Sequence, residues 1–179
     1  MDVPSVSEFA FISLGSNLSF STQELNSPEE ILSFAFTRLE SLSKKPLLKS
    51  RVYITSPIDS PLGTPDFFNA VAGLIPSEDE KPHLLLSKLQ AIENDAGRYR
   101  SGIKNEARTL DLDLITFRNE IIKSDELILP HPRAHERRFV LEPLAEIAGA
   151  EFCLPSHEKS IAGYLADMFD SQKVWKHQH

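Results

Sequence analysis

The chain has 179 residues, of which 41% are hydrophobic and 25% are charged, a composition typical of a globular protein. Its formal net charge of -7 argues against broad binding to nucleic acid or to an acidic membrane surface, because either partner requires a basic field over much of the protein. Cys153 is the only cysteine, which excludes an internal disulfide, and the N-terminal residues lack the basic and long apolar segments of a signal peptide. We expect one domain over residues 1–179, in the cytoplasm.

The N-terminal half alternates between strand-like and helix-like segments. Residues 9–14 (FAFISL) are short and apolar and run into a glycine, which predicts a buried strand. Residues 27–44 begin with SPEE, the pattern of an N-cap serine, a proline at N1 and acids in the first turn, and they end with two lysines, which predicts a helix. Residues 47–55 and 67–75 predict two further strands, and the proline-rich residues 56–66 predict a rigid loop between them.

The C-terminal half continues in the same way. Residues 82–96 have apolar side chains at helical spacing, whereas residues 98–107 carry charge and glycine without a period and predict a mobile loop. Residues 110–117 predict a fourth strand, after which the chain can turn back on itself. Short helical segments are expected around the HERR sequence and over residues 141–148 and 160–169.

The order of these segments predicts the fold class. Strand, helix, strand, strand, helix, strand is the order of a ferredoxin-like unit. Short connections and few long crossovers favour an α+β fold with a mainly antiparallel sheet packed with helices. The sequence has no glycine-rich phosphate loop of the Walker or dinucleotide type, so a bound nucleotide would depend on side chains and metal.

The strand-like segment RTLDLDLITF contains two aspartates, although aspartate is depleted in strands. Alternation places Asp111 and Asp113 on one face, with Cα atoms roughly 7 Å apart, and the intervening leucines on the other. Paired carboxylates are tolerated best beside a hard divalent cation or arginines, and Mg²⁺ commonly binds one or two carboxylates plus substrate phosphates. Two such ions about 4 Å apart could clamp a displacement at phosphorus. A solvated polar face of an amphipathic strand explains the same spacing, so the pattern alone leaves both readings open.

Cationic residues near these aspartates favour phosphoryl chemistry. Seven of the nine arginines lie between Arg98 and Arg138, and arginine presents a planar fork of donors to phosphate oxygens. His131 lies between two prolines and could donate to a phosphate, although a structural histidine explains it as well. Phe67 and Phe139 could present ring faces to a flat heterocycle or could belong to the core.

Four segments, in order, carry a resemblance: FISLGSNL, FFNAV, RTLDLDLITF and LPHPRAHERRFVLEPLAEIA. Together they resemble the 6-hydroxymethyl-7,8-dihydropterin pyrophosphokinases of folate biosynthesis over about residues 9–148, which leaves residues 149–179 as a C-terminal extension. The resemblance implies a ferredoxin-like α+β fold and transfer of the β,γ-pyrophosphate of ATP to the hydroxymethyl group of a reduced pterin, with release of AMP. It also implies two Mg²⁺ ions and ATP as co-substrate.

The resemblance further implies a role for each matching residue. Asp111 and Asp113 would hold the two Mg²⁺ ions, and Arg98 and Arg108 would neutralise charge during the transfer. The residues implied for ATP are Gln90, Glu93, Arg100, Leu114, His131 and Arg137. The residues implied for the pterin are Gly15, Thr55, Ile58, Phe67, Asn69 and Phe139, with Asn69 bonded to the pterin edge and the two phenylalanines against its ring.

The sequence departs from the family pattern at three positions. The loop between Arg98 and Arg108 has no tryptophan, although many family members have one there. Ser101, directly after Arg100, replaces a residue that is often basic. Phe67 stands where tyrosine is common. None of these changes touches the aspartate pair, so activity is expected with altered loop closure and substrate affinities. The identity of the general base is left open, because an aspartate or water could serve.

Two other classes of function remain compatible with the residues. One is a different metal-dependent nucleotidyl or phosphoryl transferase, which binding of a pterin through Asn69 would exclude. The other is a non-catalytic nucleotide-binding or scaffolding domain, which Mg²⁺-dependent release of AMP would exclude. We expect small-molecule substrates, no nucleic acid and no membrane. A functional or covalent association with other folate-pathway enzymes agrees with the resemblance.

Overall fold

The computed structural model describes residues 4–17, 26–56, 65–97, 109–168 and 174–177. The strands are β1 (Ala10–Ser16), β2 (Leu48–Lys49), β3 (Tyr53–Thr55), β4 (Phe67–Leu74), β5 (Asp111–Phe117), β6 (Ile122–Lys123), β7 (Ile128–Leu129) and β8 (Val174–Lys176). The helices are η1 (Val6–Glu8), α1 (Pro28–Glu40), α2 (Pro82–Asp95), η2 (Ala134–Glu136), α3 (Arg138–Ala148) and α4 (Ile161–Asp167), of which η1 and η2 are single 3₁₀ turns.

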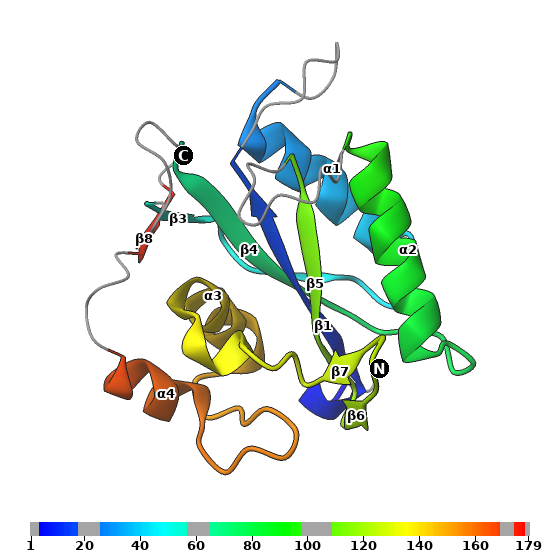
Figure 1. Cartoon of the computed structure of the whole chain (residues 1–179), viewed down its shortest axis with the longest axis vertical. Coiled ribbons are helices and arrows are strands. Elements are labelled where there is room, and N and C mark those ends of the chain that lie inside the picture. Colours follow the sequence, from blue (N-terminus) through cyan, green and yellow to red (C-terminus); the bar gives the residue numbers. More distant parts are fainter. Residues whose placement is uncertain (1–3, 18–25, 57–64, 98–108, 169–173, 178–179) are drawn as a thin grey trace.

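The central sheet has the strand order β5-β1-β4-β3-β8, with β2 also paired to β4 (Figure 1). Every strand pair in it is antiparallel. β6 and β7 form a separate antiparallel hairpin beside β5. This topology confirms the predicted α+β, ferredoxin-like fold with a mainly antiparallel sheet.

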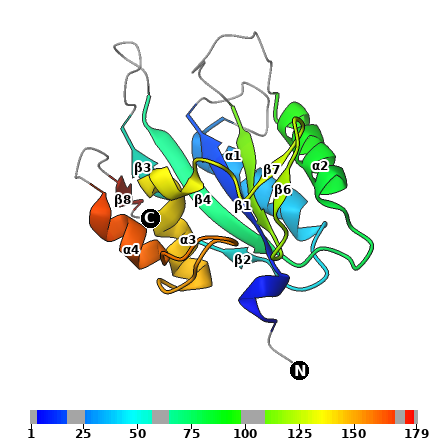
Figure 2. The same ribbon diagram turned by 60° about the horizontal axis from the view of Figure 1, so that its bottom comes forward.

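The two faces of the sheet are covered by different helices (Figures 1 and 2). α1 and α2 bury one face through a core that includes Ile12, Leu14, Leu112 and Leu114. α3 lies against the opposite face, and α4 packs on α3, around a second core that includes Phe11. Because neighbouring residues of a strand point to opposite faces, each central strand contributes to both cores.

Local signals account for some element boundaries and not for others. The Ser27 side chain accepts a hydrogen bond from the Glu30 backbone N–H, which caps the first turn of α1 as predicted. The helix ends at Glu40, four residues before Lys44, because the chain then turns to reach β2. The single strand predicted over residues 47–55 is two short strands, β2 and β3, and the sequence signals did not predict β8.

Two further predictions concern other parts of the chain. The helix expected over residues 160–169 is confirmed as α4. The loop predicted over residues 98–107 lies outside the described residues. In the described part of the chain, no helix combines the length and the apolar character that a membrane span requires.

Candidate active site

A row of four directly paired residues crosses the sheet on its α3 face. Asp111 of β5 lies opposite Gly15 of β1, Gly15 lies opposite Asn69 of β4, and Asn69 lies opposite Tyr53 of β3. Paired residues on antiparallel strands have Cα atoms about 4.5–5.5 Å apart, so Asp111 is about 10 Å from Asn69 across the glycine. The sheet thus places a carboxylate and an amide on one surface, with no side chain between them.

The Asn69 side chain is buried and its direction is fixed by its neighbours. Its Nδ2 donates to Thr55 Oγ1 at 3.0 Å, to the Phe67 carbonyl at 3.2 Å and, more weakly, to the Tyr53 carbonyl at 3.4 Å. With the amino group bound by the protein, Oδ1 is the atom that can accept a hydrogen bond from a ligand. A methyl group added at Gly15 would lie 3.6 Å from Oδ1, so the glycine keeps this oxygen uncovered.

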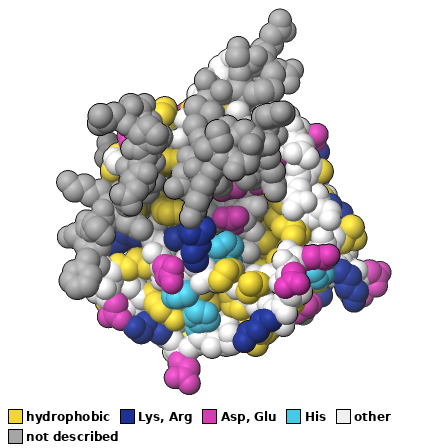
Figure 3. Space-filling model, in the orientation of Figure 1, with side chains coloured by type: hydrophobic (Ala, Val, Ile, Leu, Met, Phe, Trp, Pro, Cys, Tyr) yellow, Lys and Arg dark blue, Asp and Glu magenta, His cyan; other side chains and the backbone are white. Residues whose placement is uncertain are grey.

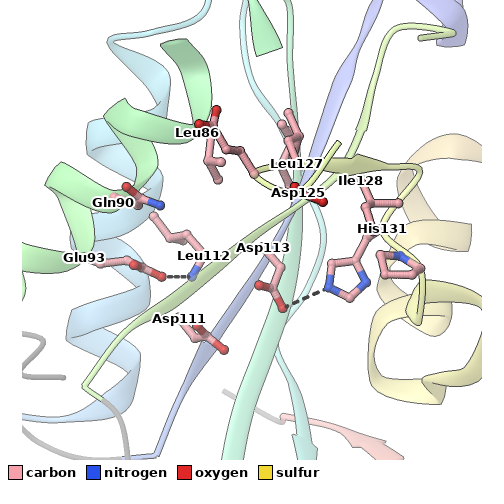
Figure 4. Close-up of a pocket in the computed structure, with 13 residues that line it drawn as sticks. Leu86, Gln90, Glu93, Asp111, Leu112, Asp113, Asp125, Leu127, Ile128 and His131 are labelled. Carbon is pink, nitrogen blue, oxygen red and sulfur yellow. Dashed lines mark hydrogen bonds and ion pairs between the residues drawn. The ribbon is translucent and has the colours of Figure 1, made fainter. Parts of the chain in front are cut away.

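A pocket of about 450 Å³ lies at the β5 edge of the sheet, where α2 and the β6–β7 hairpin meet the strand (Figure 4). Because β5 is an edge strand, both of its faces contribute to the pocket. The pocket is lined by Leu86, Gln90, Glu93, Asp111, Leu112, Asp113, Leu114, Asp125, Glu126, Leu127, Ile128, His131 and Pro132. Five of these residues are carboxylates, and no lysine or arginine is among the described lining residues. A polyanion in this pocket therefore requires added positive charge.

Asp113 has two cationic or potentially cationic neighbours. Arg137 Nη1 lies 3.3 Å from Asp113 Oδ2, and its guanidinium carbon is 5.7 Å from the centre of the Phe139 ring. His131 Nε2 lies 3.9 Å from the same Asp113 oxygen (Figure 4). Histidine, basic and acidic side chains gather near the middle of this face of the molecule (Figure 3).

His131 is held as a neutral ring. Its Nδ1 accepts a hydrogen bond from the Arg133 backbone N–H at 3.2 Å, which leaves the ring proton on Nε2, toward Asp113. Burial lowers the pKa of His131 below its ordinary value of 6.5, more strongly than the Asp113 carboxylate raises it. A neutral imidazole with its N–H directed into the pocket can donate to a ligand oxygen at pH 7.

Glu93 is a buried carboxylate on α2 and contacts the backbone of β5. Its Oε1 accepts a hydrogen bond from the Leu112 N–H at 2.7 Å (Figure 4). Leu112 separates the two aspartates, so this bond links α2 to the strand between them. An edge strand otherwise leaves such backbone groups unpaired on one side.

The sheet and the pocket group most of the residues predicted for the site. Gly15, Thr55, Phe67 and Asn69 are brought together by strand pairing. Gln90, Glu93, Asp111, Asp113, Leu114 and His131 all line the pocket. Arg137 lies beside Asp113, and Phe139 lies beside Arg137 without lining the pocket. Ile58, Arg98, Arg100 and Arg108 lie outside the described residues.

Some residues of the site were not predicted. Asp125, Glu126, Leu127 and Ile128 come from the β6–β7 hairpin and close one side of the pocket. The two consecutive acidic residues of the SDEL sequence, Asp125 and Glu126, indicate a polar turn from sequence alone. The position of this turn next to β5, however, follows from tertiary packing alone.

The donor set suits a hard cation that also binds phosphate. Asp111 and Asp113 alternate with core leucines along β5, as predicted, so both carboxylates project from the face opposite α1 and α2. Among the described residues, no three His, Cys, Asp or Glu side chains converge as a complete metal-binding set. Mg²⁺ commonly uses one or two carboxylates and takes its other ligands from water and phosphate, so the two aspartates fit this ion better than a metal that needs an all-protein cage.

The sequence matches a known family over most of its length. Residues 11–149 match the model of the 7,8-dihydro-6-hydroxymethylpterin-pyrophosphokinase family. The chain is 38% identical over 167 residues to the 2-amino-4-hydroxy-6-hydroxymethyldihydropteridine pyrophosphokinase of Haemophilus influenzae, covering 93% of this chain and 96% of that protein. It is 36% identical over 175 residues to the protein of the same name from Bacillus subtilis, covering 96% and 92% of the two chains.

Longer proteins also contain a similar segment. The chain is 37% identical over 163 residues to the folic acid synthesis protein fol1 of Pneumocystis carinii, covering 91% of this chain and 20% of that protein. The fold is similar to a solved structure described as an HPPK-DHPS in complex with substrates, with a TM-score of 0.61 and 14% identity. That match covers 88% of this chain and 44% of the other.

Proposed function

This chain belongs to the 7,8-dihydro-6-hydroxymethylpterin-pyrophosphokinase family of folate biosynthesis, and on that premise we propose that it transfers pyrophosphate from ATP to 6-hydroxymethyl-7,8-dihydropterin and releases AMP. The pterin hydroxyl oxygen would form a bond to the β-phosphorus, in line with the bond from that phosphorus to the oxygen shared with the α-phosphorus. The second bond breaks, AMP leaves with the shared oxygen, and the hydroxyl proton is released.

The observation that carries this proposal is the row from Asp111 through Gly15 to Asn69. It supports a nucleotide phosphate site beside β5 and a site for a flat, hydrogen-bonding substrate beside β4, about 10 Å apart on one surface. Such adjacency lets two bound substrates react without a large movement of the sheet.

We propose that Asp111 and Asp113 hold two Mg²⁺ ions. When bound, these ions supply positive charge to the phosphate oxygens and orient them for displacement. The strongly acidic pocket supports this assignment, because ATP alone would be repelled by its carboxylates. Arg137 balances the charge of Asp113, and neutral His131 can donate its Nε2 proton to a phosphate oxygen.

The remaining site residues are assigned to the two substrates. Gln90, Glu93 and Leu114 would form the nucleotide side of the pocket, together with Arg100. Arg98 and Arg108 would neutralise charge in the transition state. Gly15, Thr55, Ile58, Phe67, Asn69 and Phe139 would form the pterin site.

Asn69 would select the pterin through the polarity of its amide. Its Oδ1 is the oxygen that can accept from the ligand, and the edge of a 2-amino-4-oxopterin carries N–H donors that complement it. A ring without those donors would leave a buried oxygen unpaired, at a cost of about 1–3 kcal/mol.

An assay for AMP release tests the proposal. We expect AMP from ATP and Mg²⁺ only when 6-hydroxymethyl-7,8-dihydropterin is present. Asp111→Asn and Asp113→Asn should each abolish turnover, whereas Asp95→Asn, which changes an exposed carboxylate paired with Arg38, should retain it. Pterin-independent AMP release, or none in either condition, would contradict the proposal.

A further inference from the structure

A carboxylate on α3 links that helix to β3 beside the candidate pterin site. Glu146 Oε1 accepts hydrogen bonds from the Arg51 backbone N–H at 3.2 Å and from Arg51 Nε at 3.1 Å. Glu146 Oε2 accepts a hydrogen bond from the Tyr53 hydroxyl at 2.7 Å. The two residues that donate to this one side chain lie just before β3 (Arg51) and at its first position (Tyr53), more than ninety positions away in sequence.

The protonation states of Glu146 and Tyr53 maintain the hydrogen bond between them at neutral pH. Burial opposes ionisation of Glu146, but the hydrogen bonds from Tyr53 and Arg51 outweigh it and hold the pKa of the carboxyl below its ordinary value. Burial, followed by the nearby Glu146 carboxylate, raises the pKa of the Tyr53 hydroxyl well above its ordinary value. Glu146 therefore remains an acceptor and Tyr53 remains a donor over the physiological range.

Both ends of this link are connected to residues assigned to the pterin. Tyr53 lies directly opposite Asn69, and its carbonyl accepts a hydrogen bond from Asn69 Nδ2. Two residues further along β3, Thr55 accepts the shorter hydrogen bond from the same amide. A small shift of β3 would change the partners of the Asn69 amino group and with them the direction of Oδ1.

Glu146, the residue of this link that belongs to α3, lies on nearly the same face of the helix as Phe139. Glu146 is seven residues after Phe139, and seven residues complete nearly two turns, so the two side chains leave α3 on nearly the same face, about 10 Å apart along the axis. α3 packs against β4 more than against any other element, and it also contacts β3. Glu146 thus fixes the helix that carries Phe139 against the strand that carries Thr55.

We propose that Glu146 is a positioning residue for the pterin site, which acts through Tyr53 and Arg51 to set the spacing between α3 and β3. The proposal rests on the function proposed above. In this role Glu146 contacts neither substrate. Its effect falls on the pterin rather than on ATP, because the nucleotide pocket lies at the edge strand β5, which β1 and β4 separate from β3.

Steady-state kinetics of Tyr53→Phe, Glu146→Gln and Glu146→Ala test this role. Tyr53→Phe and Glu146→Ala should raise the KM for 6-hydroxymethyl-7,8-dihydropterin by about five-fold, the change expected from loss of a hydrogen bond, and leave kcat and the KM for ATP within about two-fold. Glu146→Gln should recover part of the loss, because its amide oxygen can still accept. Glu151→Gln, which changes an exposed carboxylate in the loop after α3, is the matched control and should behave as wild type.

A melting temperature for each variant separates positioning from stability alone. A lower melting temperature with an unchanged pterin KM would overturn the proposal, as would equal increases in the KM for pterin and for ATP. Calorimetric titration of the wild-type protein with 6-hydroxymethyl-7,8-dihydropterin and a non-hydrolysable ATP analogue tests the underlying function. Failure of the wild type to bind or convert the pterin would overturn both proposals, whereas normal wild-type activity with unaffected variants would overturn only the role of Glu146.

Discussion

Glu93 and Leu112 are joined by a hydrogen bond from a strand backbone to a buried carboxylate, at 2.7 Å. The bond holds the segment between Asp111 and Asp113 against α2. Glu93→Ala would leave the Leu112 N–H without this acceptor, and we expect a loss of about 1–3 kcal/mol in the free energy of unfolding. Glu93→Gln retains an acceptor oxygen and should lose less.

Mn²⁺ titration and denaturant unfolding of the two Glu93 variants measure this effect. If Glu93 positions the aspartates through the backbone, Glu93→Ala should weaken Mn²⁺ binding in the presence of an ATP analogue, and Glu93→Gln should restore most of it. Equal weakening in both variants would show instead that the negative charge of Glu93 acts directly at the site.

Replacement of Gly73 or Gly15 in the sheet by alanine should affect different properties: stability at Gly73 and pterin binding at Gly15. A Cβ at Gly73 would lie 2.9 Å from a ring carbon of Phe11, so Gly73→Ala should destabilise the protein by about 1–3 kcal/mol. A Cβ at Gly15 has an ordinary contact of 3.6 Å with Asn69 Oδ1, so Gly15→Ala should fold normally. Its methyl group should raise the pterin KM, because it covers the proposed acceptor. Melting temperatures and pterin KM values check both expectations, and a wild-type pterin KM in Gly15→Ala would argue against the role of Oδ1.

Arg137 contacts one residue assigned to the metal and one assigned to the pterin. Arg137→Lys keeps the charge near Asp113 but loses the planar guanidinium at 5.7 Å from the Phe139 ring. We expect a rise in the KM for both substrates and a fall in kcat/KM of about ten-fold, because two contacts are weakened at once. Arg38→Lys, at an exposed ion pair on α1, is the control for a generic arginine replacement. Unchanged kinetics in Arg137→Lys would show that charge alone is required.

His157 should make the protein less stable on mild acidification. Its Nδ1 lies 2.7 Å from the Tyr164 hydroxyl, and burial, followed by the neighbouring His135, lowers the pKa of His157 below 6.5. The unfolded chain therefore takes up a proton on His157 at higher pH than the folded chain does. The contribution of neutral His157 to the free energy of unfolding is fully present above about pH 6.5 and is lost as the pH drops through the folded pKa. His157→Gln should flatten this dependence in urea denaturation at pH 7.5 and 5.5. An identical slope in the variant would exclude His157 as its source.

The alternation of aspartate and leucine in β5 was predictable from sequence, because a strand has a fixed period of two residues. The helical spacing of α2 also contained the signal for Glu93, which follows the core residue Leu89 by four positions and so lies on the buried side. What such a glutamate contacts depends on the packing of α2 against β5, which no local pattern specifies.

The parts that sequence did not predict depend on contacts between distant segments. The hydrogen bonds from Arg51 and Tyr53 to Glu146 connect two elements whose separate sequences look ordinary. The hairpin acids at Asp125 and Glu126 join the pocket for the same reason. Strand β8 is short, and it pairs with β3 without a strong apolar alternation of its own.

The alternation of side chains along β1 and β5 has a consequence for inherited variation in this protein. In β1, for example, adjacent codons specify residues with different roles: Leu14 contributes to the core under α1 and α2, and Gly15 faces the candidate active site. A missense change at Leu14 should therefore reduce the amount of folded protein, whereas a change at Asp113 should leave normal amounts of an inactive one. Only the second kind of variant would compete with the wild-type protein for ligands or partners when both are expressed in one cell.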